Sequence, residues 1–127
     1  MLGYVIVTHV GIGREMVRAV EEILKEKLPM VVVEVDSQRP TAETHDRIVA
    51  AVASFADREG VLILTDIFGA TPTNLCRDLI SQGRVAAVTG LNLPMVLKAA
   101  TMRFEKGPAE AAAFLNSYGR ENIRTFP

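Results

Sequence analysis

The chain has 127 residues, 49% of them hydrophobic, and its 14 basic and 15 acidic residues give a formal net charge of -1 at pH 7. This length predicts one domain spanning residues 1–127, with roughly two-thirds of its unfolded surface buried on folding. The sequence has neither a basic stripe nor an aromatic platform for bases, which argues against a nucleic-acid partner.

The first residues lack a charged leader and a cleavage site, and no apolar stretch approaches the length of a membrane span. We therefore expect a cytoplasmic protein. The single cysteine, Cys76, cannot form an internal disulfide, and its helical spacing predicts a small buried hydrophobic residue rather than a nucleophile.

Apolar runs rich in β-branched residues alternate with segments of helical period. Strands are predicted at 4–8, 31–35, 61–65 and 85–89. The first helix follows the first strand and buries Met16, Val17, Val20, Ile23 and Leu24; the second runs from about Thr41 to Ala56 and buries Ile48, Val49, Val52 and Ala53. This order predicts a doubly wound, mostly parallel α/β sheet with helices on both faces.

The second half of the chain continues the alternation. A third helix is predicted to begin at Thr71 as N-cap with Pro72 in its first position, and to end at Gly83. Its buried face is predicted to be Leu75, Cys76, Leu79 and Ile80. A fourth helix opens at Asn92-Leu93-Pro94, and a fifth runs from Pro108 to Tyr118 and stops at Gly119. The polar segment 121–126 is predicted to be a short antiparallel edge strand, or a strand that pairs with another subunit.

Polar residues follow the predicted strands at what should be one edge of the sheet. These residues are His9, Asp36, Asp66 and Thr89. Doubly wound sheets bind ligands at the carboxyl ends of their strands, where the strand order reverses. An imidazole at such an edge is suited to act as a nucleophile, a base or a metal ligand, although position alone leaves a structural role for His9 open. We expect His45, inside the second helix beside Asp46, to be an ordinary solvated residue.

Three other chemistries fit the sequence poorly. No HxH, HExxH or cysteine pair accompanies His9, so no metal site is predicted. Gly11-Ile12-Gly13 is followed by Met16 where a dinucleotide fingerprint needs a third glycine, and Asp36 only weakly imitates the acidic ribose contact. A response-regulator receiver would need acidic residues after the first strand, where this chain has Thr8-His9.

Three blocks of residues resemble the enzyme IIA (EIIA) domains of the mannose/fructose/sorbose family of the phosphotransferase system (PTS). They are the first strand ending in Thr8-His9, the segment Leu64–Asn74 (LTDIFGATPTN), and the segment Gly90–Met95 (GLNLPM). The resemblance implies a phosphotransferase without a cofactor. In it, His9 accepts a phosphoryl group from the phosphohistidine of the carrier protein HPr and passes it to an EIIB domain, while Asp66 holds the imidazole.

The chemistry of the residues agrees with that implication. A carboxylate that accepts the N–H of one ring nitrogen leaves the lone pair of the other, Nε2, facing a donor. Backbone N–H groups of Gly69, Ala70 and Thr71, where the third helix is predicted to open, are candidates to bind the phosphoryl oxygens, and the Thr71 hydroxyl is a further candidate donor. Two positions depart from the family pattern: Val10 stands where glycine is frequent, and Gly69-Ala70 replaces Gly-Gly.

The resemblance also implies a homodimer that exchanges its terminal strand, and it leaves open a peripheral association with a membrane sugar permease. Because the chain ends at Pro127, we expect the EIIB acceptor to be a separate protein. The alternative hypothesis is a regulatory phosphorylation switch or binding module on the same fold, without sugar transport. The sequence does not separate the two, and it does not name a sugar.

Overall fold

A computed structural model describes residues 1–127 and contains one four-stranded sheet. Its strands are β1 (Gly3–His9), β2 (Met30–Val35), β3 (Val61–Thr65) and β4 (Val85–Val88). They run parallel in the order β2-β1-β3-β4. The four predicted strands are therefore confirmed. The chain leaves β1 toward β2 and then crosses to the other side for β3 and β4, so the strand order reverses between β1 and β3.

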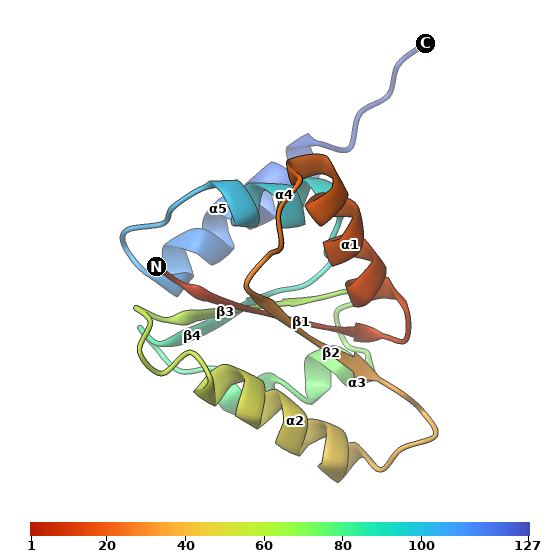
Figure 1. The fold of residues 1–127 in the computed structure, drawn as a ribbon, viewed down its shortest axis with the longest axis vertical. Coiled ribbons are helices and arrows are strands. Elements are labelled where there is room, and N and C mark those ends of the chain that lie inside the picture. Colours follow the sequence, from red (N-terminus) through yellow and green to blue (C-terminus); the bar gives the residue numbers. More distant parts are fainter.

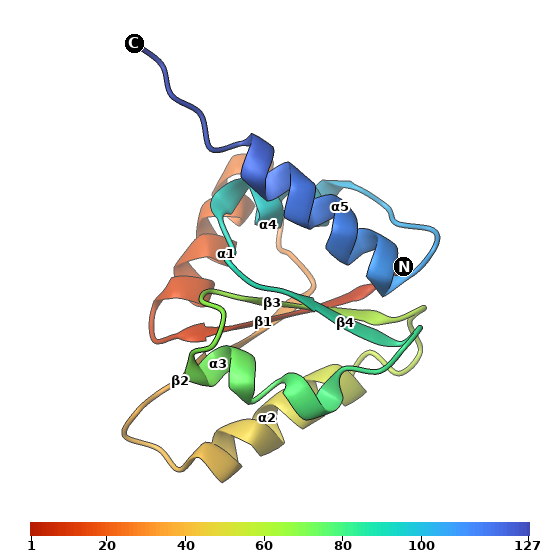
Figure 2. The same ribbon diagram turned by 180° about the vertical axis from the view of Figure 1, so that it is seen from behind.

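Five helices cover the two faces of this sheet. They are α1 (Ile12–Leu24), α2 (Thr41–Ala53), α3 (Thr71–Asn74), α4 (Leu93–Thr101) and α5 (Pro108–Glu121). Helices α1, α4 and α5 lie on one face and α2 and α3 on the other (Figures 1 and 2). This is the predicted doubly wound α/β architecture. None of the helices combines the length and the apolarity needed to cross a bilayer.

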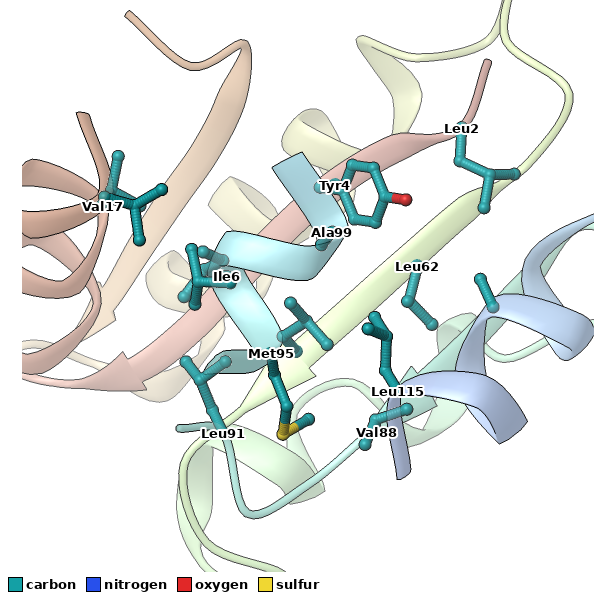
Figure 3. Packing of buried hydrophobic residues seen from close by; sticks show 14 of the residues in the cluster. Leu2, Tyr4, Ile6, Val17, Leu62, Val88, Leu91, Met95, Ala99 and Leu115 are labelled. Atoms are coloured by element: carbon teal, nitrogen blue, oxygen red, sulfur yellow. The ribbon is translucent and has the colours of Figure 1, made fainter. Parts of the chain in front are cut away.

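The core is divided into two layers by the sheet. On the side of α1, α4 and α5, Ile6, Leu62 and Leu115 are fully buried (Figure 3). On the opposite side, Val7 and Ile63 pack in a second cluster with Ile48 of α2. Because helices cover both faces, every residue of β3 is buried, which explains the uninterrupted apolar run from Val61 to Leu64.

The predicted third helix is much shorter in the structure. α3 is a single turn, and after a break at Leu75 and Cys76 only a 3₁₀ turn, η1 (Arg77–Leu79), continues the segment. The hydroxyl of Thr73 bonds the Ile67 carbonyl, which ties the first turn to the end of β3. Cys76 is buried, as predicted, and burial raises the pKa of its thiol to about 12, with the charge of Asp78 acting in the same direction.

The helical spacing of apolar residues predicted some core positions incorrectly. Ile23, Val49, Ala53 and Ile80 were predicted to be buried but are exposed. In α2 the inward residues are Thr44, Ile48 and Ala51, so its buried face is rotated from the predicted one. The apolar spacing thus predicted where these helical segments lie, but it did not predict which of their apolar residues are buried.

The C-terminal segment also differs from its prediction. α5 passes through Gly119 to Glu121, and residues 123–127 extend away from the sheet without forming a strand (Figure 1). Gly119 does not stop the helix; it allows a close approach, because an added Cβ would lie 2.6 Å from the Met95 sulfur. Its carbonyl accepts a hydrogen bond from the Asn92 amide. Gly119 therefore joins α5 to α4, and no edge strand forms within the chain.

Candidate functional site

His9 and Asp66 meet at the carboxyl edge of the sheet, where the strand order reverses. His9 is the last residue of β1, and Asp66 directly follows the adjacent β3. The Asp66 Oδ2 atom lies 2.7 Å from Nδ1 of the His9 ring and accepts the His9 backbone N–H at 2.9 Å. One carboxylate oxygen thus fixes both the main chain and the ring of His9.

Exposure of the two side chains differs sharply. The Asp66 side chain is 7% exposed, whereas that of His9 is 44% exposed. In the neutral tautomer that carries its proton on Nδ1, the Nδ1–H donates to the carboxylate and Nε2 holds the free lone pair. The arrangement presents the exposed edge of an imidazole ring in a fixed orientation, with a shielded carboxylate behind it.

The carboxyl group of Asp66 is held in its charged form. Burial opposes that charge, but the hydrogen bonds from the His9 backbone and ring, the attraction of the His9 ring and the hydrogen bond from its own backbone together outweigh the burial. The net effect is a pKa below the ordinary aspartate value. Its other oxygen, Oδ1, accepts the Ile67 N–H at 3.0 Å.

The backbone after His9 is fixed from the opposite face of the sheet. The fully buried Thr8 hydroxyl donates to the His9 carbonyl at 2.7 Å and accepts the Gly13 N–H at 2.8 Å. Glu34 of β2 accepts the Gly11 N–H at 2.7 Å and forms an ion pair with Arg14 at 3.2 Å. The turn from β1 into α1 is therefore fastened by two strand side chains. The role of Glu34 was not predicted from the sequence, although a single charged residue within an apolar strand could have indicated it.

The loop after Asp66 carries the three predicted phosphoryl-binding residues. Gly69 has φ +82°, Ala70 is the N-cap of α3, and Thr71 is its first residue. The prediction of Thr71 as N-cap is wrong by one position, and Ala70 offers no side-chain cap. α3 lies next to β1 and β2, which brings this loop to the edge that bears His9. Because α3 has one turn, its dipole is far smaller than a long helix would supply.

Thr73 anchors this loop to the sheet and was not assigned a role from the sequence. It is buried, donates to the Ile67 carbonyl at 2.6 Å and accepts a hydrogen bond from the Thr65 hydroxyl at 2.8 Å. The sequence did not indicate this role of Thr73, because its hydrogen-bond partners, Thr65 and Ile67, lie on the other side of a turn.

The remaining polar residues considered from the sequence lie apart from the pair of His9 and Asp66. The Asp36 carboxylate accepts the Gln38 N–H at 2.9 Å, and thereby closes a turn between β2 and α2. Thr89 lines a groove beside β4. His45 contacts Asp78 of η1 at 2.8 Å through Nε2 and so joins α2 to the segment after α3. It is partly buried and has a specific partner rather than being merely solvated.

Apolar side chains surround the His9 edge without being covered. Val10 and Ile12 follow His9, and Ile67 and Phe68 follow Asp66. All four are exposed, Phe68 to 71%. A surface of this composition around an exposed polar side chain is typical of a site that contacts a macromolecule.

The family of the chain follows from comparison with known proteins. Residues 3–115 match the family model EIIA-man, described as the PTS system fructose IIA component. The chain belongs to this family. The resemblance drawn from its three sequence blocks is confirmed, and the protein is an EIIA-type component of a phosphotransferase system. A search of curated protein sequences gave no significant match.

Solved structures agree with the fold of the EIIA-man family. The mannose/sorbose-specific IIA subunit from Enterococcus faecalis is similar to this chain with a TM-score of 0.89, at 23% identity over 99% of this chain and 95% of that one. The component EIIA from Streptococcus agalactiae has a TM-score of 0.86 at 22% identity, covering 99% and 98%. A sigma-54 interaction domain protein from Enterococcus faecalis also has this fold, with a TM-score of 0.67 at 18% identity over 98% of this chain and 97% of that one.

Proposed function

We propose that the protein carries a phosphoryl group on Nε2 of His9, accepting it from phospho-HPr and passing it to an EIIB protein. The observation that supports this most strongly is the 2.7 Å contact between Nδ1 of His9 and Asp66, because it leaves Nε2 as the nucleophile on a half-exposed ring. Membership of the EIIA-man family supports the donor and acceptor classes.

The transfer step breaks one P–N bond and forms another. The Nε2 lone pair of His9 attacks the phosphorus, and the bonding pair to phosphorus returns to the donor imidazole. His9 keeps its Nδ1 proton throughout, so phosphorylation makes the ring cationic. Asp66 stabilises that cation, which is the role of a buried carboxylate next to a histidine that gains charge. Transfer onward reverses these changes.

Positioning and electrostatics supply the rest of the catalysis. Phosphoryl transfer passes through a loose transition state whose charge lies on three equatorial oxygens. Backbone N–H groups of Gly69, Ala70 and Thr71 are the proposed donors to these oxygens. The anchoring of this loop by Thr73 and of His9 by Asp66 favours a fixed geometry between donors and nucleophile. No metal takes part in this mechanism.

The exposed apolar side chains at the edge fit proteins as donor and acceptor. The donor protein and the acceptor protein must each approach Nε2 closely, and water must leave the site before transfer. Val10, Ile12, Ile67 and Phe68 would be covered by the partner in either complex, which supports docking of one protein at a time.

We further propose a homodimer in which residues 123–127 of one subunit add to the sheet of the other. β4 is the edge strand beside α5, and a groove of about 560 Å³ runs there, lined by Phe68, Thr89 and Gly119 among others. Ile123 and Phe126 are 78% and 87% exposed, and such side chains gain from burial against a second copy. Light scattering should give twice the subunit mass at micromolar concentration; one subunit's mass would contradict the dimer.

A regulatory switch is the second candidate function. A sigma-54 interaction domain protein shares this fold, and a regulatory role for His9 is the alternative to a transport relay. Onward transfer to an EIIB protein favours the relay. Retained phosphate together with altered affinity for a partner favours the switch.

The proposal is tested by phosphate uptake from phosphoenolpyruvate in the presence of enzyme I and HPr. The wild type should take up acid-labile phosphate, and His9→Ala should take up none. His45→Ala is the matched control, because it removes the only other histidine. Uptake by His9→Ala at the wild-type rate would refute the assignment. Failure of the wild type with phosphorylated cognate HPr would refute the carrier function.

A further inference from the structure

Arg77 makes two contacts that lead back to the loop after Asp66. Its Nε–H donates to Oδ1 of Asn74 at 3.1 Å, and the Asn74 amide donates to the Gly69 carbonyl at 3.2 Å. The guanidinium carbon also lies 5.5 Å from the centre of the Phe68 ring. One side chain of η1 thus contacts the aromatic residue of the loop directly and the loop backbone through Asn74.

The contacts of Arg77 act on the middle of this loop. Gly69 has φ +82°, in the left-handed region, and the following Ala70 is extended, at φ -84° and ψ 172°. Thr73 fixes only the first residue of the loop, through the Ile67 carbonyl. The carbonyl of Gly69 points to Asn74, and fixing that peptide unit also fixes the direction of the next N–H, that of Ala70, because the peptide is planar.

These contacts do not neutralise the positive charge of Arg77. Its partners are a neutral amide and an aromatic ring, and a guanidinium over a ring keeps its positive charge. The neighbouring Asp78 pairs with His45 instead. Arg77 therefore combines a fixed orientation with a positive charge beside the loop proposed to bind a dianionic group.

We propose that Arg77 is a positioning residue for phosphoryl transfer, acting through Asn74 and Phe68 to hold the Gly69-Ala70 peptide in the orientation that receives the phosphoryl oxygens. The proposal rests on the proposed function of His9. It assigns to Arg77 a geometric role that lysine cannot replace, because lysine has no N–H at the Nε position and no planar guanidinium to place over the Phe68 ring. Arg77 does not touch the reacting atoms.

The experiment measures single-turnover phosphoryl uptake by Arg77→Lys, Asn74→Ala and the double variant, with Arg18→Lys as the matched control. Arg18 is an exposed arginine of α1 that pairs with Glu15. Arg77→Lys should lower the first-order transfer rate about three- to tenfold, the size of one hydrogen bond or cation–π contact, with the half-saturating donor concentration unchanged within about twofold. The double variant should lose less than the product of the two single losses, because both act on one carbonyl.

Two results would overturn the proposal. They are a wild-type transfer rate for Arg77→Lys, which would reduce the role of Arg77 to its charge, and multiplicative losses in the double variant. A second measurement is independent of HPr: ¹⁵N relaxation of the Gly69 and Ala70 amides in the unphosphorylated protein should show increased mobility in Arg77→Lys and not in Arg18→Lys. Unchanged relaxation would also overturn the proposal. If the wild type takes up no phosphate while the relaxation changes, the function of His9 fails and the holding role of Arg77 stands.

Discussion

Replacing Asp66 by asparagine separates the charge of the side chain from its shape. In the wild type, Asp66 accepts hydrogen bonds from the His9 N–H, the His9 ring and the Ile67 N–H. An amide has only one acceptor oxygen, so one of its two possible orientations places its NH₂ group against the Ile67 N–H. The other places NH₂ against His9 and makes Nδ1 the acceptor, which moves the ring proton to Nε2 and removes the nucleophile.

The expected losses are large in rate and moderate in stability. Hydrogen bonds to a charged group contribute about 1.5–3 kcal/mol and neutral ones about 0.5–1.5 kcal/mol, so losing the charge and one acceptor should cost about 2–3 kcal/mol of the free energy of unfolding. The loss of stabilisation of the cationic ring, together with the wrong tautomer, predicts a fall in transfer rate of about 10²- to 10⁴-fold.

Rapid-quench measurement of phosphate uptake from phospho-HPr tests this expectation, with urea unfolding of the same samples as the control for folding. Asp66→Ala provides the comparison, because it removes every acceptor without imposing a tautomer. It should also be slow and should unfold cooperatively. A transfer rate for Asp66→Asn within about threefold of the wild type would refute the role given to the carboxylate.

Two further predictions concern stability. Because the folded state lowers the pKa of Asp66, its contribution is present above the pKa of an unfolded aspartate, about 3.9, and is lost as the pH falls through the lower folded-state value. Glu59, whose pKa is lowered by its hydrogen bond to the terminal amine and by the amine's charge, acts in the same direction in both proteins. Asp66→Asn lacks only the Asp66 contribution, so its urea midpoint should fall less steeply from pH 6 to pH 2 than that of the wild type. Parallel slopes would contradict this. Gly13→Ala should lower the free energy of unfolding by about 1–3 kcal/mol, because its Cβ would lie 3.0 Å from atoms of Ile6, Thr8 and Val32. This loss would outweigh the gain of about 1 kcal/mol that alanine normally brings to a helix. Thermal unfolding checks it, and an unchanged or raised midpoint would show that the contact relaxes freely.

The sequence predicted those parts of the fold that depend on local pattern. β3 is apolar from Val61 to Leu64 because both its faces are covered, and this made its strand and its parallel sheet predictable. Asn92 also acted as expected from its type: its side chain accepts the Met95 N–H at the start of α4. His9 and Asp66 were predicted to meet because both follow buried strands, and the strand order made those strands neighbours.

The errors lie where distant contacts override local signals. Gly119 is a typical helix stop by sequence, yet its role is close packing against Met95, which no local pattern reveals. The third helix is cut short at the turn that Thr73 ties to Ile67, and Asp78 of η1 pairs with His45 on another element. Glu34, which fastens the turn after His9, depends on the register of β2 against β1.

The most direct test of the central claim is NMR spectroscopy of the phosphorylated protein, with ¹⁵N-labelled histidine and ³¹P detection, to determine which ring nitrogen of His9 carries phosphorus. The 2.7 Å contact between Nδ1 and Asp66 predicts phosphorus on Nε2, with the proton retained on Nδ1. Phosphorus on Nδ1 of His9, or on His45, would contradict the mechanism.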